Sequence, residues 1–287
     1  MISVIIPAYN EENAIGETVR NVLSILNQSL YQPIEVLVVD DGSTDNTFIE
    51  AEMAGARVIR QPHNIGYGRS LKDGIKVAVY DTIVISDADG TYPIEAIPNL
   101  IYEYQKGFDM VVGARQGKHY DESLIKTIFR HTLRVLVQFA SGRKIPDINS
   151  GLRVFSKKAI LPYFTRLCDT FSFTTSLTLA YMMTGKFVFY ISIAYHKRVG
   201  KTKVRLFRDA LRTIQFIVEA VIFYNPLKIF IFFSGMLILF SIFGVLITVC
   251  FHILAGYILG IGSFLLAILM FGIGLLSVLL KQIMHEK

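Results

Sequence analysis

The stretch VISDADGTYP, residues 84–93, joins an apolar run to two closely spaced acids. Residues 82–85 are typical of a buried strand, and Asp87 and Asp89 follow directly after Ser86. Side chains of an extended chain alternate with a period of two, so both carboxylates are expected to point the same way. Two adjacent anions are costly unless a cation lies near them, and Mg²⁺ or Mn²⁺ held by carboxylates, water and phosphates fits this pattern. A solvated turn whose acids cap a helix is the alternative.

Polar residues follow two further predicted strands in the same way. Residues 3–7 run into the letters AYNE, and residues 35–39 run into DDGS. Further strands are predicted at 57–60 and 109–113, and helices at 13–26, 44–54, 67–80 and 94–105. This alternation predicts an α/β fold with a mostly parallel sheet, in which ligands bind beyond the carboxyl ends of the strands. The three polar clusters therefore predict one shared binding site.

The C-terminal part of the chain is apolar enough to cross a membrane. Residues 227–280 contain one Lys, one His and no Arg, Asp or Glu. A break at Ala255-Gly256 divides them into spans at about 229–253 and 257–280, each longer than the ~20 residues that a hydrocarbon core requires. A pair of buried core helices is the alternative. Lysines flank the predicted hairpin but not its turn, which predicts an integral membrane protein with two transmembrane helices and a cytoplasmic N-terminal domain.

Charge is distributed unevenly along the rest of the chain. Residues 1–110 hold 7 Lys and Arg against 16 Asp and Glu, whereas residues 111–226 hold 19 against 6. The basic part includes two predicted amphipathic helices, at 123–140 and 204–223, with basic residues beside an apolar stripe. Such helices lie at membrane interfaces, although packing against the sheet is the alternative. The predicted division is a cytoplasmic α/β domain at residues 1–203, an amphipathic interface helix at 204–226 and a transmembrane hairpin at 227–287.

Two common nucleotide-binding motifs do not occur in the sequence. The letters PAYNEE stand where a Gly-x-Gly-x-x-Gly turn would follow the first strand, and there is no Gly-x-x-x-x-Gly-Lys-Ser/Thr loop. A nucleotide held by carboxylates and a metal, without a phosphate loop, suggests a nucleotide-sugar. Asp41 is suited to accept hydrogen bonds from a base or a ribose, and Gly66, Gly68 and Gly74 are expected to allow close backbone packing nearby. No nucleic acid partner is expected.

The motifs resemble a known family in their order along the chain. VIIPAYNEE, VVDDGSTDNT, HNIGYGRSLKDGI and SDADGTYP are similar to the successive motifs of family 2 glycosyltransferases with the GT-A fold. VVGAR, DINSGLRVFSKKA and HKRVGKTK, followed by two apolar spans, resemble the polyprenyl-phosphate branch. That branch includes dolichyl-phosphate mannose synthases and bacterial polyprenyl-phosphate glucosyltransferases. The resemblance covers essentially the whole chain, and it implies a GT-A catalytic domain that is Rossmann-like.

The resemblance implies roles for the residues of the donor site. Residues of the first motif line the nucleotide site, namely Pro7, Tyr9 and Glu11. Asp41 matches the acid that reads the base, and Asp87 and Asp89 match the Asp-x-Asp motif, with Asp89 as the ligand of Mg²⁺ or Mn²⁺. Some members place a Gln after this motif as a further metal contact, whereas this chain has Thr91. The metal ligands expected from the protein are thus Asp89, Asp87 and, as a third, Thr91, which would act either as a weak ligand or through a water. Arg198 matches a basic residue that contacts the donor diphosphate.

The resemblance also implies an acceptor site. Arg115 matches an arginine assigned to the acceptor phosphate, and Arg130 and Arg134 are further candidates. A phosphate monoester is already anionic near neutral pH, so transfer to it does not require a strong general base. Asp147, in the letters DINSGLR, is expected to orient the acceptor or to take a residual proton, and a helix-cap or turn role is the alternative.

The predicted function is an inverting, metal-dependent sugar transfer. The donor is a UDP- or GDP-linked sugar, and the acceptor is the phosphate of polyprenyl or dolichyl phosphate in a lipid bilayer. A membrane glycosyltransferase with a hydroxyl acceptor is one alternative, although the chain has no Trp and therefore lacks the Gln-x-x-Arg-Trp segment of that type. A membrane-anchored nucleotide-sugar-binding module without activity is another. The sequence leaves a homo-oligomer open.

Overall fold

The computed structural model describes residues 1–117, 124–199 and 206–285. Within these ranges, the side chains of residues 124–126, 128–130, 206–209, 284 and 285 are outside the description. The chain divides into two compact units, Met1–Ile217 and Val218–Lys287. Each unit is described by itself below.

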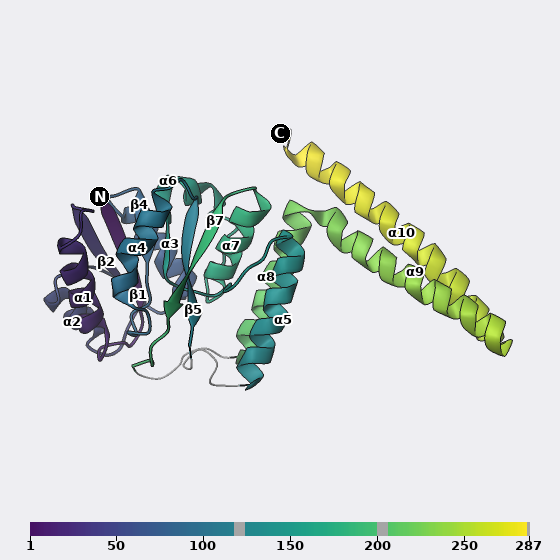
Figure 1. Ribbon diagram of the computed structural model, residues 1–287, viewed down its shortest axis with the longest axis horizontal. Coiled ribbons are helices and arrows are strands. Elements are labelled where there is room, and N and C mark those ends of the chain that lie inside the picture. The colour runs from purple at the N-terminus through teal and green to yellow at the C-terminus, as the bar shows by residue number, and fades with distance from the viewer. Residues whose placement is uncertain (118–123, 200–205, 286–287) are drawn as a thin grey trace. The chain divides into compact units, whose positions relative to one another are not determined.

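The first unit contains a seven-stranded sheet with the order β3-β2-β1-β4-β6-β5-β7 (Figure 1). The strands are β1 (Ile2–Ala8), β2 (Ile34–Asp40), β3 (Arg57–Arg60), β4 (Thr82–Ile85), β5 (Met110–Gln116), β6 (Arg153–Ser156) and β7 (Val188–Ala194). Strand β6 pairs antiparallel with both β4 and β5, and the other pairs are parallel. The predicted mostly parallel α/β sheet is therefore confirmed.

Helices cover both faces of this sheet. The first unit contains α1 (Ile15–Asn27), α2 (Thr47–Met53), α3 (Tyr67–Val77), η1 (Ile94–Ala96), α4 (Ile97–Tyr104), α5 (Leu124–Ser141), α6 (Lys157–Ile160), η2 (Leu161–Tyr163), α7 (Phe173–Met183) and the first part of α8 (Leu206–Tyr224). Alternate residues of β1 serve the two faces because strand side chains have a period of two. Val4 and Ile6 belong to the same core cluster as Ile15 and Val19 of α1. Ile5 instead faces α3, where its Cγ2 lies 2.7 Å from the place that a Cβ of Gly74 would take.

The second unit is a hairpin of α9 (Pro226–Phe251) and α10 (Leu254–His285), which lie side by side in Figure 1. Segments 226–251 and 254–283 are long and apolar enough to cross a membrane, and only 11% and 17% of their most apolar windows are buried. The large apolar side chains therefore face outward, which argues against a pair of buried core helices. Ser234 and Ser241 donate hydrogen bonds to backbone carbonyls of α10, at 2.9 and 2.7 Å.

The turn of the hairpin lies earlier than the sequence predicts. His252 has a left-handed backbone, with φ of 51°, and it ends α9, so the turn is at residues 252–253 rather than at Ala255-Gly256. Gly256 instead belongs to α10 and faces α9. A Cβ at Gly256 would lie 2.7 Å from the carbonyl oxygen of Gly244. The glycine therefore permits helix contact, and the prediction mistook a packing residue for a turn residue.

Candidate active site

A pocket of about 360 Å³ lies beyond the carboxyl ends of β1, β2 and β4. Its lining includes seven residues that the sequence predicts for the donor site: Pro7, Tyr9, Glu11, Asp41, Asp87, Asp89 and Arg198. These residues come from three strand ends and from the segment that follows β7. The predicted convergence of the three polar clusters is therefore confirmed. Their individual roles stay predictions.

Asp41 is held by the segment that leads into α3. Its two carboxylate oxygens each accept a hydrogen bond at 2.9 Å, one from the backbone N–H of Ile65 and one from that of Gly66. Gly66 has φ of +129°, a backbone conformation that L side chains rarely adopt. Burial raises the pKa of Asp41 above its usual value, and this effect outweighs the hydrogen bonds from Ile65, Gly66 and Ser70. Asp41 is thus a fixed acceptor at one end of the pocket.

Asp89, which is buried, and Asp87, which is half-buried, form a pair of carboxylates in the same pocket. Asp87 accepts a hydrogen bond from the Tyr67 hydroxyl at 2.9 Å. Gly151 backs it so closely that a Cβ there would lie 2.6 Å from Asp87 Oδ1. Burial, followed by the negative charge of Asp89, raises the pKa of Asp87 to about 6. Two like charges are therefore held together in a site that disfavours both being ionised.

Thr91 and Arg198 contact the second acid of this pair. Thr91 donates to Asp89 Oδ1 through its backbone N–H, at 3.1 Å, and through its hydroxyl, at 2.6 Å. Arg198 bridges two acids, because Nη1 lies 3.2 Å from Asp89 Oδ2 and Nη2 lies 2.7 Å from Glu11 Oε1. Backbone hydrogen bonds from Val199 to Asp89 and from His196 to Thr91 fix the segment that carries this arginine. A cation from far along the chain thus partly neutralises the pair.

The donor set fits a divalent ion that also binds phosphate oxygens. Asp87 and Asp89 offer two neighbouring carboxylates whose mutual repulsion a cation would relieve. Across residues 1–117, 124–199 and 206–285, no three His, Cys, Asp or Glu side chains gather as a metal site. An ion held by one or two carboxylates and completed by phosphates is the mode that Mg²⁺ prefers. The chain's own residues are therefore consistent with Mg²⁺ or Mn²⁺ that binds together with a nucleotide.

Arg115 and Asp147 form a separate buried ion pair. Arg115 donates Nε to Asp147 Oδ2 at 2.7 Å and Nη2 to Oδ1 at 2.9 Å. The guanidinium also lies 5.3 Å from the ring centroid of Tyr195. Burial raises the pKa of Asp147, but the charge and hydrogen bonds of Arg115 outweigh it and hold that pKa below its usual value. Neither residue lines the pocket.

The remaining predicted acceptor residues lie on α5. Arg134 is half-buried on this helix. The side chain of Arg130 lies outside the described part of the chain. The structure therefore does not bring Arg134 into the pocket, and it leaves the placement of Arg130 a prediction.

Arg153 is a buried residue that the sequence reasoning missed. It is fully buried on β6 and donates hydrogen bonds to the carbonyls of Ile148 and Ser150 and to the Thr178 hydroxyl. Arg153 thereby ties the loop that contains Asp147 to α7. A lone arginine inside an apolar, strand-like run was the available signal, since a charged side chain is seldom fully buried unless it is paired.

Other pocket residues were also missed by sequence reasoning. The lining includes Asn64, Ile65, Tyr67, Ser70, Thr170, Phe171 and Arg212. The predicted close packing at Gly66, Gly68 and Gly74 was the signal for the first four. Thr170 and Phe171 follow no predicted strand, so the pattern of strand ends could not find them.

Comparison with known proteins agrees with this geometry. A family model described as Glycosyl transferase family 2 matches residues 3–164, more than half of the chain. The chain belongs to glycosyl transferase family 2. The resemblance seen in the motifs is thus confirmed, and this family comprises glycosyltransferases.

Curated proteins match part of the chain. Undecaprenyl-phosphate 4-deoxy-4-formamido-L-arabinose transferase of Serratia proteamaculans is 32% identical over 165 residues, which cover 55% of this chain and 50% of that protein. The protein of the same name from Salmonella choleraesuis is 30% identical over the same shares. Uncharacterized protein MJ1222 of Methanocaldococcus jannaschii is 34% identical over 55% of this chain and 65% of its own length. The matches thus span between 50% and 65% of these relatives.

Solved structures match a larger part of the chain. Glucosyl-3-phosphoglycerate synthase from Mycobacterium tuberculosis, in complex with Mn²⁺, UDP and glucosyl-3-phosphoglycerate, has a TM-score of 0.61 at 21% identity, with 77% of this chain and 80% of that chain covered. The complex of that enzyme with Mg²⁺ and UDP has a TM-score of 0.59 at 20% identity, with 77% and 79% covered. These likenesses confirm the GT-A fold.

Proposed function

We propose that this family 2 glycosyltransferase transfers the sugar of a UDP- or GDP-linked hexose to the phosphate of polyprenyl or dolichyl phosphate. The transfer inverts the configuration at the anomeric carbon. The acceptor phosphate oxygen forms a bond to that carbon. The bond from the carbon to the donor diphosphate breaks, and its electron pair leaves with the nucleoside diphosphate. The observation that carries the proposal is the Asp87–Asp89 pair with Arg198, in one pocket with Asp41.

The donor occupies this pocket in the proposed complex. Asp41 accepts hydrogen bonds from the nucleoside at one end, and Asp87 and Asp89 would hold Mg²⁺ or Mn²⁺ at the other. The ion, when bound, stabilises the charge that grows on the leaving diphosphate. The raised pKa of Asp87 supports this assignment, because a bound cation would offset the burial of the carboxylate charge and the negative charge of Asp89, which raise that pKa.

Arg198 adds a second positive charge at the leaving group. Its Nη atoms contact Glu11 and Asp89, and its buried Nε has no hydrogen-bond partner among the described residues. This donor is free to bind a phosphate oxygen, and the planar guanidinium can contact two oxygens at once. Electrostatic stabilisation fixed in advance at the developing charge is a large contribution to catalysis.

Arg115 binds the acceptor phosphate in this proposal, and Asp147 orients it. The low pKa of Asp147 makes it a weak proton acceptor, which favours the orienting role over a general base. This suits an acceptor that is already ionised near neutral pH. Arg130 and Arg134 are further candidates on α5. Two relatives are undecaprenyl-phosphate 4-deoxy-4-formamido-L-arabinose transferases, which supports a lipid phosphate acceptor.

The hairpin of α9 and α10 places the enzyme at the membrane in this proposal. Its length, its apolar composition and its exposed side chains support two transmembrane helices. The lysines that flank the hairpin favour a cytoplasmic catalytic domain. The basic region 111–226 suits anionic head groups and the acceptor phosphate.

A donor and acceptor screen tests the function. Purified full-length protein in detergent is incubated with Mn²⁺, polyprenyl phosphate and each of several labelled UDP- and GDP-sugars. We expect a labelled lipid-phosphate sugar with at least one donor. Product formed only on lipids with a free hydroxyl would favour the hydroxyl-acceptor alternative. Binding of a nucleotide-sugar without turnover on either lipid would favour a module without activity.

A further inference from the structure

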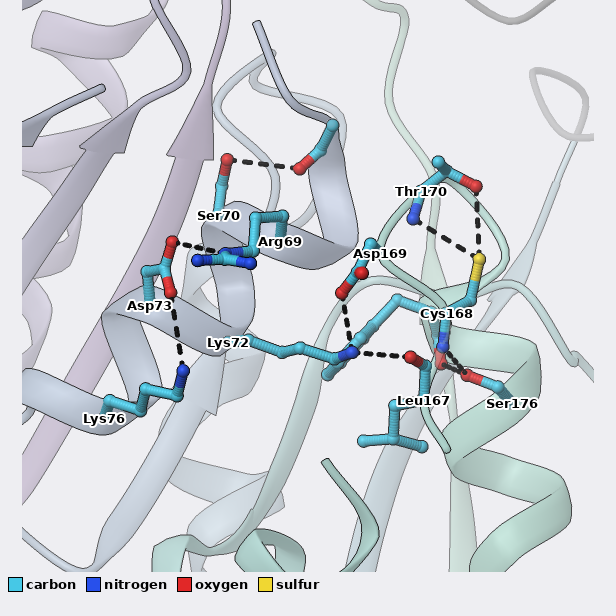
Figure 2. Close-up of polar contacts among 12 residues, drawn as sticks. Arg69, Ser70, Lys72, Asp73, Lys76, Leu167, Cys168, Asp169, Thr170 and Ser176 are labelled. Carbon is cyan, nitrogen blue, oxygen red and sulfur yellow. Dashed lines mark hydrogen bonds and ion pairs between the residues drawn. The ribbon is translucent and has the colours of Figure 1, made fainter. Parts of the chain in front are cut away.

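Residues 167–171, here called the wall segment, cross the first turn of α3 and reach the pocket. Thr170 and Phe171 are part of the pocket lining. The backbone N–H of Arg69 in α3 donates to the carbonyl of Asp169 at 2.8 Å. Figure 2 shows Lys72 of α3 reaching toward the wall segment, whereas Asp73 and Lys76 lie on the other side of the helix. One face of the pocket therefore depends on a segment that belongs to none of the three strand ends.

Two glycines let the wall segment approach the helix. A Cβ at Gly68 would lie 2.2 Å from the carbonyl oxygen of Cys168, and one at Gly66 would lie 2.9 Å from that of Asp169. Contacts under 3.0 Å do not occur for real Cβ atoms, so any larger residue would move the backbone apart. The glycines permit the contact, but they supply no attraction that holds it.

Lys72 supplies that attraction. Its Nζ donates to the carbonyl of Leu167 and to Asp169 Oδ1, at 2.5 and 2.6 Å (Figure 2). Lys72 is only 7% exposed, and a buried ammonium is costly unless its hydrogen bonds are satisfied. Its charged neighbours on α3 behave differently, because Asp73 pairs with both Arg69 and Lys76 at the surface. Lys72 is thus directed at the wall segment.

We infer that Lys72 is a positioning residue of the donor pocket, which holds Thr170 and Phe171 against the nucleoside part of the donor. This inference rests on the proposed function. Thr170 Cγ2 lies 3.5 Å from the place of a Cβ on Gly66, and the N–H of Gly66 binds Asp41. The wall segment therefore lies at the Asp41 end of the pocket. The ring of Phe171, which is 38% exposed, offers an apolar surface to a nucleoside there.

Cys168 provides a direct measure of the wall segment's position. The residue is 2% exposed, and its Sγ accepts a hydrogen bond from the backbone N–H of Thr170 at 3.3 Å. The Cys168 N–H donates to Ser176 Oγ at the start of α7. The chain has two cysteines, so substitution of Cys250 by serine leaves one thiol to follow. Release of the wall segment would expose that thiol to a maleimide.

The experiment compares Lys72→Met with Lys76→Met in the full-length Cys250→Ser protein. Lys76 is a matched control because it lies one turn further along α3 and pairs at the surface with Asp73. For Lys72→Met we expect Cys168 labelling to be faster by about tenfold or more, as a hydrogen bond from a charged donor is lost. We expect the KM for the nucleotide-sugar and the Kd for the nucleotide to rise about tenfold. The kcat and the acceptor KM should change little, and Lys76→Met should match the parent.

Two further variants keep the test decisive if Lys72→Met does not fold. Asp169→Ala removes a side chain that is 55% exposed, so it should fold and shift both readouts in the same direction by less. Phe171→Ala should weaken nucleotide binding without faster Cys168 labelling, because it removes the contact but leaves Lys72 in place. Unchanged labelling in Lys72→Met and Asp169→Ala would overturn the role of Lys72. Faster labelling with unchanged nucleotide affinity would overturn the wall segment's part in donor binding.

The parent protein separates this inference from the proposed function. If the parent binds none of the UDP- or GDP-nucleotides with Mn²⁺, the proposed function fails, and the donor role of the wall segment fails with it. If the parent binds nucleotide and Lys72→Met and Asp169→Ala both behave like the parent, the proposed function stands and the inference fails. Cys168 labelling reports on the contact of Lys72 with the wall segment in either case, because the labelling requires no ligand.

Discussion

The Asp87–Asp89 pair and the Arg115–Asp147 pair each join a buried carboxylate to a half-buried partner, but their charges are arranged in opposite ways. Burial and a neighbouring anion raise the pKa of Asp87 to about 6. The bidentate contact with Arg115 instead holds the pKa of Asp147 below its usual value. The first pair lacks enough positive charge without a ligand, whereas the second is already balanced. The first is therefore suited to bind a cation with its donor, and the second to hold a fixed arginine.

The largest expected effect comes from the Asp87–Asp89 pair, here called the unbalanced pair because the two acids lack enough positive charge. Asp89→Ala should lower the rate of sugar transfer by about 10³-fold or more, because it removes electrostatic stabilisation at the leaving diphosphate. Mn²⁺ binding, followed by electron paramagnetic resonance in the presence of nucleotide, should weaken in parallel. Asp109→Asn is the control, since Asp109 pairs with Lys186 and does not line the pocket. Normal Mn²⁺ binding by Asp89→Ala would show that the ion binds elsewhere.

The Arg115–Asp147 pair, here called the balanced pair, should give a smaller and more selective effect. Arg115→Met should raise the KM for polyprenyl phosphate by about 10- to 100-fold, because a bidentate cation for the phosphate is lost. The KM for the nucleotide-sugar should change little. Asp147→Asn keeps the shape of the partner but removes its charge, and it should give a milder change of the same kind. Equal increases in the two KM values would count against the placement of Arg115 at the acceptor.

The two pairs also show what sequence reasoning could reach. Asp41, Asp87 and Asp89 were predictable because each follows an apolar strand, and strand ends of a parallel sheet converge. The contact of Arg115 with Asp147 was not predictable in this way, because it joins the end of β5 to a loop before the antiparallel β6. That short strand enters the sheet between β4 and β5 and leaves no periodic pattern of its own.

The wall segment lay beyond sequence reasoning for a related reason. Its place depends on Lys72, whose partners Leu167 and Asp169 are more than 90 residues away. The turn of the hairpin was misplaced because Gly256 is a packing residue and His252 takes the left-handed conformation instead. Local patterns thus predicted the elements and the strand-end site, whereas contacts between distant loops depend on the folded structure and leave no local pattern.

Removal of one charge from the unbalanced pair should stabilise the protein without ligand. The rise of the Asp87 pKa from 3.8 to about 6 corresponds to about 3 kcal/mol of unfavourable free energy when Asp87 is ionised. Asp87→Asn should therefore raise the thermal unfolding temperature of the metal-free protein at pH 7.5, while transfer is lost. Asp147→Asn should lower that temperature, since it leaves Arg115 buried without its charged partner.

The same pair predicts a dependence on pH with a definite sign. The folded pKa of Asp87 lies above the unfolded one, so the folded state binds more protons between about pH 4 and 6. Its contribution to stability therefore increases as pH falls through about 6, and Asp87→Asn should remove this part of the pH profile. Mn²⁺ binding should weaken over the same range, because protonation removes a ligand charge. A metal affinity that does not change between pH 7.5 and 5.5 would contradict the assignment of Asp87.

The smallest expected effect concerns Thr91, which separates two views of the unbalanced pair. Its hydroxyl donates to Asp89 Oδ1 at 2.6 Å, so it orients the carboxylate in the structure, whereas the sequence suggested a third metal contact. Thr91→Val removes about 1 kcal/mol of hydrogen bonding and should lower the transfer rate about fivefold. Thr91→Ser keeps the hydroxyl and should restore most of the rate. If Thr91 only orients Asp89, Mn²⁺ and Mg²⁺ should be affected equally, because no ligand is lost. A change in the preference between the two ions would instead show that the hydroxyl contacts the metal.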